Sequence, residues 1–222
     1  MPRVTEEYLE SKRKMIVDCA YQVCLRKPVE MVTISDVIAE TGMSQGAIYR
    51  YYNGLDEILA DMITMMRSDY NIIDDFEKIL SDKKASLEDI VYQVCNCLGD
   101  TMEKHLMDIQ KINFDLGVIA INEPERAARI MEGIKGSGNL EYLGNNALPM
   151  MIGGAYSLGY KPVASPEEIV QFVSASYTGI EKYCIMSNCY GTGNPDVKAE
   201  PKKLFATLAK SIIMLLGGKV NE

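Results

Sequence analysis

The sequence predicts an all-α protein with two parts, and three observations carry that prediction. Helix-capping patterns recur along the 222 residues, apolar side chains repeat at helical spacing, and no segment alternates as a strand would. The length allows a packed core, and the composition of 47% hydrophobic and 24% charged residues is typical of a globular protein. We expect a three-helix head at residues 1–54 and a helical body at residues 55–222.

The head starts with a helix predicted over residues 6–26, preceded by Thr5. Its apolar face comprises Met15, Val17, Ala20, Tyr21 and Leu25.

A second and a third helix follow with very little chain between them. Thr33 and Asp36 have the spacing of a capping box, which starts the second helix. Gly42 ends that helix, because glycine adopts the left-handed backbone of a helix end cheaply. Ser44 then caps a third, short helix. The spacing is that of a helix-turn-helix, whose second helix enters the DNA major groove in such folds.

The first half of the body has three predicted helical segments. Asn53 and Asp56 open a helix that we expect to reach Leu80, and residues 81–84 form a loop. Ser86 and Asp89 cap the next helix, which is predicted to end near Gly99. Residues 101–121 continue the helical pattern, and Pro124 restarts the chain at the first position of another helix.

The second half of the body is less regular. Seven glycines between residues 133 and 161 favour loops with one or two short helical pieces. Ser165, Pro166 and Glu168 form a clear helix start, and that helix is predicted to end near Asn188. Residues 190–195 read as a turn-rich linker, and Pro201 opens a last helix that reaches Leu216.

One block of the head carries a family resemblance. It comprises Thr33, Ile34, Val37, Ile38, Gly42, Met43, Ser44, Gly46, Ile48, Tyr49, Tyr51 and Tyr52, followed by the segment Asn-Gly-Leu-Asp-Glu-Ile-Leu at residues 53–59. This block resembles the DNA-binding motif of the TetR family of transcriptional regulators. The motif covers about the first quarter of the chain, and the rest resembles the family in length and helical pattern.

The resemblance implies a DNA-binding domain at residues 1–54 whose third helix reads the DNA. It implies that Gln45, Gly46, Ala47, Tyr49 and Arg50 face the DNA. The hydroxyl groups of Thr33, Ser44 and Tyr49 are placed to bind phosphates. Chemically, Gln45 can make two hydrogen bonds to adenine, and Arg50 can reach guanine or a phosphate. Glycine at position 46 allows a close approach of the backbone to the groove.

Two features of the sequence oppose strong DNA binding. The family often has a phosphate-binding lysine where this chain has Leu55. The net charge is −8, and residues 1–54 hold seven basic and seven acidic side chains, so the head is neutral. Lys12, Arg13 or Lys27 could replace the missing lysine.

Residues 55–222 are expected to bind an effector and to dimerise, as the resemblance implies. Methionine and tyrosine form adaptable pockets, so an apolar or cationic small molecule is the expected effector of this acidic body. The candidate effector-binding residues are Tyr70, Tyr92, Met102, His105, Phe114 and Tyr177.

The resemblance also implies that the last two helices pair with those of a second copy. Apolar residues at helical spacing suit such a seam: Ile169, Phe172, Val173, Ser176, Ile180 and Tyr183 on one helix, and Leu204, Leu208, Ile212, Leu215 and Leu216 on the other.

We expect no metal, no cofactor and no enzymatic activity. His105 is the single histidine, and Cys95 and Cys97 are two residues apart, which on a helix points their thiols in different directions. No glycine-rich stretch has the spacing of a phosphate-binding loop, and no catalytic triad is recognisable. The sequence has no apolar leader and no apolar stretch that could span a membrane, so we expect a cytoplasmic protein with six reduced cysteines.

The resulting expectation is a ligand-responsive transcriptional regulator that acts as a repressor. A homodimer would bind a palindromic DNA operator and leave it when a small-molecule effector binds. The alternative is a helical dimer that binds a ligand or a protein and whose head is a degenerate DNA reader.

Overall fold

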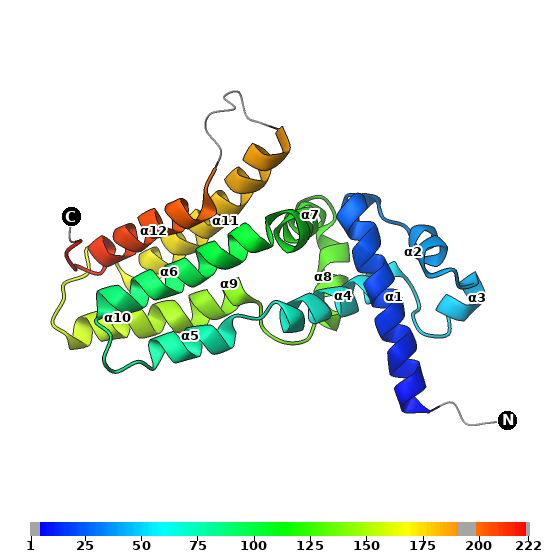
Figure 1. The fold of residues 1–222 in the computed structure, drawn as a ribbon, viewed down its shortest axis with the longest axis horizontal. Helices are drawn as coiled ribbons and strands as arrows, with labels where there is room; N and C mark the ends of the chain where they lie inside the picture. The colour runs from blue at the N-terminus through cyan, green and yellow to red at the C-terminus, as the bar shows by residue number, and fades with distance from the viewer. Residues whose placement is uncertain (1–4, 191–198, 221–222) are drawn as a thin grey trace. The chain divides into compact units, whose positions relative to one another are not determined.

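The computed structural model describes residues 5–190 and 199–220, and within these ranges it consists of helices, turns and no strands. The all-α prediction is confirmed. The chain divides into two compact units, one formed by residues 1–70 with 111–136 and the other by residues 71–110 with 137–222 (Figure 1). No helix in the described ranges combines the length and the hydrophobicity of a membrane span. Most of the predicted linker at residues 190–195 lies outside the described residues.

The first unit contains the three helices of the head and three further helices. These further helices pack against one another and against the head. In chain order they are α1 (Glu6–Arg26), the 3-10 turn η1 (Val29–Met31), α2 (Ile34–Thr41), α3 (Gln45–Ile48), α4 (Leu55–Asp69), α7 (Lys111–Asn122) and α8 (Pro124–Gly133). Helix α1 contacts both α2 and α4, and α8 contacts both α4 and α7.

The predicted caps of the head are present. The Thr33 hydroxyl accepts a hydrogen bond from the Asp36 amide, and the Asp36 carboxylate accepts one from the Thr33 amide. Gly42 has φ +65° and ends α2 in the left-handed conformation. The Ser44 hydroxyl then accepts from the amide of Ala47, which starts α3 after a short turn. The helix-turn-helix predicted from these residues is therefore confirmed.

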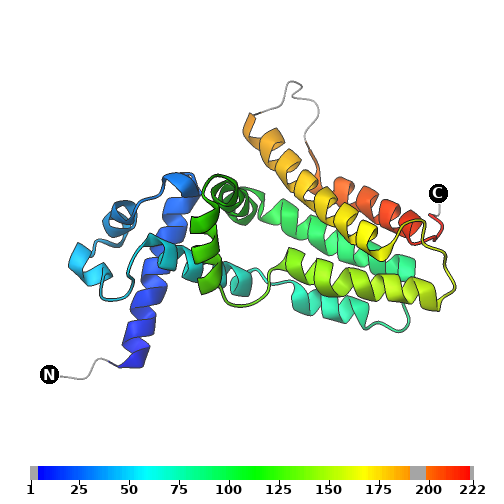
Figure 2. The same ribbon diagram turned by 180° about the vertical axis from the view of Figure 1, so that it is seen from behind.

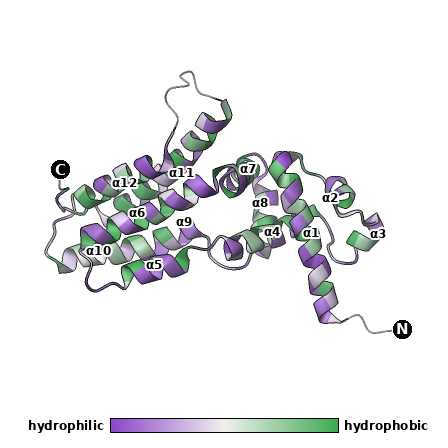
Figure 3. Cartoon of the chain, in the orientation of Figure 1, coloured by the Kyte–Doolittle hydropathy of each residue, from purple (hydrophilic) through white to green (hydrophobic). Residues whose placement is uncertain are grey.

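The second unit is a bundle of helices, seen from two sides in Figures 1 and 2. It contains α5 (Ile73–Leu80), α6 (Leu87–Lys104), the π-helix η2 (Leu106–Gln110), α9 (Asn139–Tyr142), the π-helix η3 (Leu143–Ala147), α10 (Leu148–Ser157), α11 (Pro166–Tyr190) and α12 (Pro201–Leu215). Hydrophobic and hydrophilic residues are interspersed along the helices of this unit (Figure 3).

The core of this unit is centred on the close packing of α6 and α12. A Cβ atom added to Gly99 on α6 would lie 3.1 Å from the Lys202 Cα atom and 3.4 Å from the Phe205 Cβ atom, so glycine allows this crossing. Phe205 is fully buried, and its ring meets that of Tyr177 edge to face at 5.7 Å between centroids. Helix α11 contacts α12 and so contributes Tyr177 to the same core.

The predicted helix over residues 53–80 is wrong, because the chain breaks it between α4 and α5. The Asn71 side chain accepts a hydrogen bond from the Ile73 amide at 2.6 Å. The Asn139 side chain accepts one from the Ile72 amide at 3.1 Å. The two asparagine side chains thus accept hydrogen bonds from backbone amides that would bond to backbone carbonyls in a continuous helix. The helix also begins at Leu55 rather than at Asn53.

The predicted loops at residues 133–161 are also wrong for much of that segment, since residues 139–157 are helical without interruption. A glycine in a helix costs about 1 kcal/mol relative to alanine. The buried apolar stripe of this segment offsets that cost, because each large buried side chain contributes about 1.5–3 kcal/mol. The stripe comprises Leu143, Ala147, Leu148, Met151, Ile152 and Ala155.

Two smaller predictions concern a helix end, which is wrong, and a domain boundary, which stays a prediction. The helix that starts after Ser86 continues to Lys104, beyond the predicted end at Gly99. The two compact units do not follow the boundary at residue 54, since α4, α7 and α8 belong to the same unit as the head. The functional division at residue 54 stays a prediction.

Burial changes the predicted dimer seam. On α11, Ile169 and Val173 are buried within their own unit. On α12, the same is true of Leu208, Ile212 and Leu216. Helical spacing identified these residues as apolar, but it could not distinguish a face that packs inward from one that packs on a partner. These five side chains are unavailable for contacts between copies.

Candidate DNA interface and effector region

The predicted DNA-reading residues lie on the outward side of α3 and its first following turn. Gln45, Gly46 and Arg50 are exposed, Tyr49 is 44% exposed, and Ala47 is half-buried. The inward residue of this short helix is Ile48, which is fully buried and fixes the helix against the head. An added Cβ atom at Gly46 would meet open space, so nothing within the protein requires glycine there.

Two hydroxyl groups predicted to contact phosphates are exposed, and they differ in their present hydrogen bonds. The Thr33 hydroxyl donates to the Asp36 carboxylate at 2.7 Å and is part of the capping box. The Ser44 hydroxyl accepts from the Ala47 amide at 3.3 Å, a role that leaves its proton for an acceptor such as a phosphate oxygen.

The Lys27 side chain lies beside the capping box and pairs with an acidic residue there. Its Nζ atom is 2.7 Å from the Asp36 carboxylate. The hydrogen bond from Lys27, together with those from Thr33, lowers the pKa of Asp36 to about 2. Arg13 similarly lies over the Tyr52 ring and 3.8 Å from Asp61. Two of the three cations named as replacements for the missing lysine therefore already have partners within the first unit, and the third, Lys12, lies over the Tyr8 ring.

Leu55 is the first residue of α4 and is partly exposed. The next residue, Asp56, accepts a hydrogen bond from Arg126 Nε at 2.8 Å and lies 3.6 Å from the Arg129 guanidinium. Two α8 arginines thus hold the start of α4 in place. A side chain at position 55 projects from a well-anchored helix start.

Replacing Leu55 by lysine is expected to add one phosphate contact per subunit, or two per dimer. The slope of log affinity against log salt should become steeper by about 0.9 per contact, or about 1.8 for the pair. Operator and random DNA should gain alike, since a phosphate contact carries no base information. Titration of parent and variant at several salt concentrations measures both slopes. An unchanged slope would mean that residue 55 does not face the DNA backbone.

A second anchor of the head was not found from the sequence. On α7, the Asp115 carboxylate accepts a hydrogen bond from the Val29 amide at 3.3 Å and pairs with Lys111 at 2.9 Å. The Lys111 ammonium also donates to the carbonyl of Cys24 at 3.5 Å. Because these α7 residues are 86 and 87 residues from their partners, only the fold could place them there. This contact ties α7 to the end of α1 and to η1.

The predicted effector residues fall in both units. Met102 and Tyr177 are buried in the core of the second unit, at 1% and 8% exposure. Tyr92 and His105 belong to the same unit and are half-buried. Tyr70 and Phe114 belong to the first unit. The effector role of all six residues stays a prediction.

Two polar groups near Tyr177 were not predicted. Gln110 is 5% exposed, and its Oε1 atom has no hydrogen-bond partner among the residues that the structure describes. One helical turn after Tyr177 on α11 lies Glu181, and burial raises the pKa of its carboxyl to about 7. Burial, and then the charge of Glu181, raises the pKa of Tyr177, while the adjacent Gln110 side chain acts in the opposite direction. These polar groups are far apart in sequence, so no motif could reveal them.

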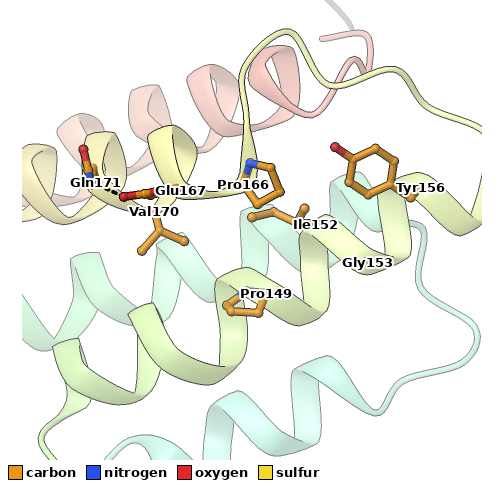
Figure 4. A pocket seen from close by; sticks show the side chains of 8 residues that line it. All are labelled: Pro149, Ile152, Gly153, Tyr156, Pro166, Glu167, Val170 and Gln171. Atoms are coloured by element: carbon orange, nitrogen blue, oxygen red, sulfur yellow. Dashed lines mark hydrogen bonds between the residues drawn. The ribbon is translucent and has the colours of Figure 1, made fainter.

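An open, largely apolar groove of about 610 Å³ lies between α10 and the first turns of α11 (Figure 4). It is lined by Pro149, Ile152, Gly153, Tyr156, Pro166, Glu167, Val170 and Gln171. Within the part of the chain that the structure describes, no three histidine, cysteine or acidic side chains gather as metal ligands would. His105 instead pairs with Asp108 at 3.1 Å.

Comparison with known proteins identifies the class to which the head belongs. Residues 16–62 match the family described as bacterial regulatory proteins, tetR family. The chain is 34% identical over 62 residues to YfiR of Bacillus subtilis (strain 168), an uncharacterised HTH-type transcriptional regulator. That match covers 28% of this chain and 30% of the length of the relative. Residues 16–62 of the head thus match the family that its motif resembles.

The rest of the chain is similar to TetR-family proteins in fold. A putative TetR-family regulator from Rhodococcus sp. matches with a TM-score of 0.66 at 9% identity, over 93% of this chain and 99% of that one. FadR of Thermus thermophilus, a TetR-family repressor in complex with lauroyl-CoA, matches with a TM-score of 0.54 at 14% identity, over 95% and 96%. The predicted architecture of helix-turn-helix head and helical body is thus confirmed.

Proposed function

We propose that this chain is a ligand-responsive transcriptional regulator that represses by binding a palindromic operator as a homodimer. The observation that carries the proposal is the exposed face of α3 on a helix-turn-helix held by the caps of Thr33 and Ser44. Gln45 and Arg50 supply base-reading chemistry at that face, and Gly46 lets the backbone come close. The head carries as many acidic as basic side chains, so we expect two heads acting together to be needed for useful affinity.

The homodimer is proposed to form along the exposed side of α11, which retains Phe172, Ser176 and Tyr183 of the seam first predicted. Exposed or half-buried residues follow each other at intervals of four and three residues, the spacing of a helix-helix seam. They are Phe172, Ser176, Gly179, Tyr183 and Met186. Large exposed apolar side chains on one face indicate an interaction site, and Met150 and Tyr156 on α10 extend this surface.

Gly179→Leu is expected to shift the protein from dimer to monomer. An added side chain at Gly179 meets open space within the protomer, so the fold should be retained while the seam is blocked. Gly117→Leu is the matched control, because that helical glycine on α7 also faces open space. Sedimentation equilibrium measures both dissociation constants. A Gly179→Leu dimer as tight as the control would exclude α11 as the seam.

The effector is proposed to bind the second unit, and to be apolar or cationic. Its core offers Met102 and Tyr177, side chains that adapt to apolar ligands, and the body carries the negative charge of the chain. The complex of Thermus thermophilus FadR with lauroyl-CoA supports a ligand-binding role for this fold. Ligand binding would favour a head arrangement that no longer fits two successive major grooves.

The alternative function is a ligand- or protein-binding helical dimer with a degenerate head. Leu55 and the internal pairing of Lys27 with Asp36 favour it, because both reduce phosphate contacts. Selection from a pool of random DNA duplexes distinguishes the two functions. We expect enrichment of a palindrome whose half-sites are one helical turn, or a multiple of it, apart. Recovery of unenriched or asymmetric sequences would favour the alternative.

A further inference from the structure

The buried end of η2 contains an unsatisfied polar atom with no evident structural use. Gln110 is nearly fully buried, and its Oε1 atom lacks a hydrogen-bond partner among the described residues. Buried polar atoms are usually paired, since an unpaired one costs about 1–3 kcal/mol. The amide of Gln110 closes the wide turn of the π-helix by donating to the His105 carbonyl at 3.1 Å. Such π segments are frequent at functional sites.

Helix α11 packs against η2 and brings the Tyr177 hydroxyl to Gln110, with Glu181 one helical turn further along α11. The Tyr177 side chain is 8% exposed and adjacent to the Gln110 side chain. Glu181 follows Tyr177 by four residues, so both lie on the same face of α11. Glu181 is half-buried, and burial raises the pKa of its carboxyl, with no cation of the described residues among the causes of that shift.

We propose that Gln110, Tyr177 and Glu181 form a subsite for the protonated amine of an amphipathic effector. This inference rests on the proposed ligand-responsive function and specifies its effector class. An ammonium group supplies three donors and one positive charge, which match the Gln110 carbonyl oxygen, the Tyr177 hydroxyl and the Glu181 carboxylate. A hydrocarbon part would pack beside Met102 and the Tyr177–Phe205 ring pair. Methionine adapts its shape to such a ligand.

The position of Gln110 in the chain gives the subsite a route to the head. The next residue is Lys111, which pairs with Asp115 and donates to the Cys24 carbonyl. Asp115 in turn accepts from the Val29 amide just before the helix-turn-helix. Gln110 is therefore the last residue before the helix that carries these contacts with the head.

Calorimetric titration with three probes of one carbon skeleton tests the subsite. The probes are 4-phenylbutylamine, 4-phenyl-1-butanol and 4-phenylbutanoate. The full-length parent should bind the amine at least about 10-fold more tightly than the alcohol, and the carboxylate more weakly than both. Glu181→Gln should remove the preference for the amine. Glu132→Gln, an exposed carboxylate on α8, should retain it.

Gln110→Met keeps the side-chain volume and removes the unpaired oxygen, so it should weaken amine binding while the protein stays folded. Absence of amine binding to the parent, equal binding of amine and alcohol, or a preference for the carboxylate would each overturn the subsite. DNA binding of the same preparations is measured without probe. Intact DNA binding with no amine preference removes the subsite alone, whereas amine preference without DNA binding removes the proposed function alone.

Discussion

Gln45→Ala is expected to weaken operator binding by about 1–3 kcal/mol at one base position in each half-site. Two half-sites per dimer make this one of the largest effects of a single substitution in the chain. The reason is the loss of a two-bond contact from an exposed side chain at the start of α3. The preference for the base at that position should relax at the same time, which competition with operators altered at each position measures.

Two companion variants separate base reading from other roles of α3. Gly46→Ala meets open space in the free protein, so it should leave stability unchanged and reduce operator affinity by crowding the groove. Tyr49→Phe should weaken binding to all sequences alike, because the hydroxyl of this exposed side chain is assigned to a phosphate. If Gln45→Ala and Tyr49→Phe both leave the binding isotherm unchanged, α3 is not the recognition helix.

Glu181→Gln is expected to stabilise the protein at pH 8 by on the order of 1–3 kcal/mol. Burial raises the pKa of this carboxyl from 4.5 to about 7 in the folded state. The folded state therefore holds its proton more tightly than the unfolded state does. Below about pH 4.5 the carboxyl is protonated and does not destabilise the folded state. As pH rises toward 7 it destabilises the folded state increasingly.

The pH dependence of the gain in stability distinguishes burial of the Glu181 carboxyl from a general effect of removing a charge. The gain from Glu181→Gln should be largest at pH 8 and close to zero at pH 4.5. Urea unfolding at four pH values measures it, with the exposed Glu132→Gln as control. A gain that is independent of pH, or one that the control shares, would contradict the assigned burial. Groups with strongly shifted pKa values cluster at functional sites, which agrees with the place of Glu181 in the proposed subsite.

The parts of the fold that could be predicted are those that neighbouring residues determine. Thr33 with Asp36, Ser86 with Asp89, and Gly42 act within one turn, so their patterns identify helix ends correctly. The break between α4 and α5 depends on the side chain of Asn139, which is 67 residues away from its partner. No local pattern contains that information.

The same distinction applies to the candidate sites. The DNA-reading face consists of consecutive residues on one short helix, so a motif finds it. The subsite joins Gln110 to α11, and the head anchor joins Asp115 to Val29 across 86 residues. Burial also decides between faces of one helix: Val173 is inside and Phe172 outside, although both are apolar neighbours. Periodicity identifies the apolar residues of a helix, and only the packing shows which of them are buried.

The central claim is that α3 reads a DNA sequence, and the affinity ratio between two duplexes tests it most directly. One duplex carries the palindrome selected from random DNA, and the other has the same composition in scrambled order. At about 0.15 M salt the account predicts a preference of at least about 10³-fold for the palindrome, together with affinity that falls as salt rises. Equal affinity for the two duplexes, or no binding at low salt, would contradict it and leave a helical dimer with a degenerate head.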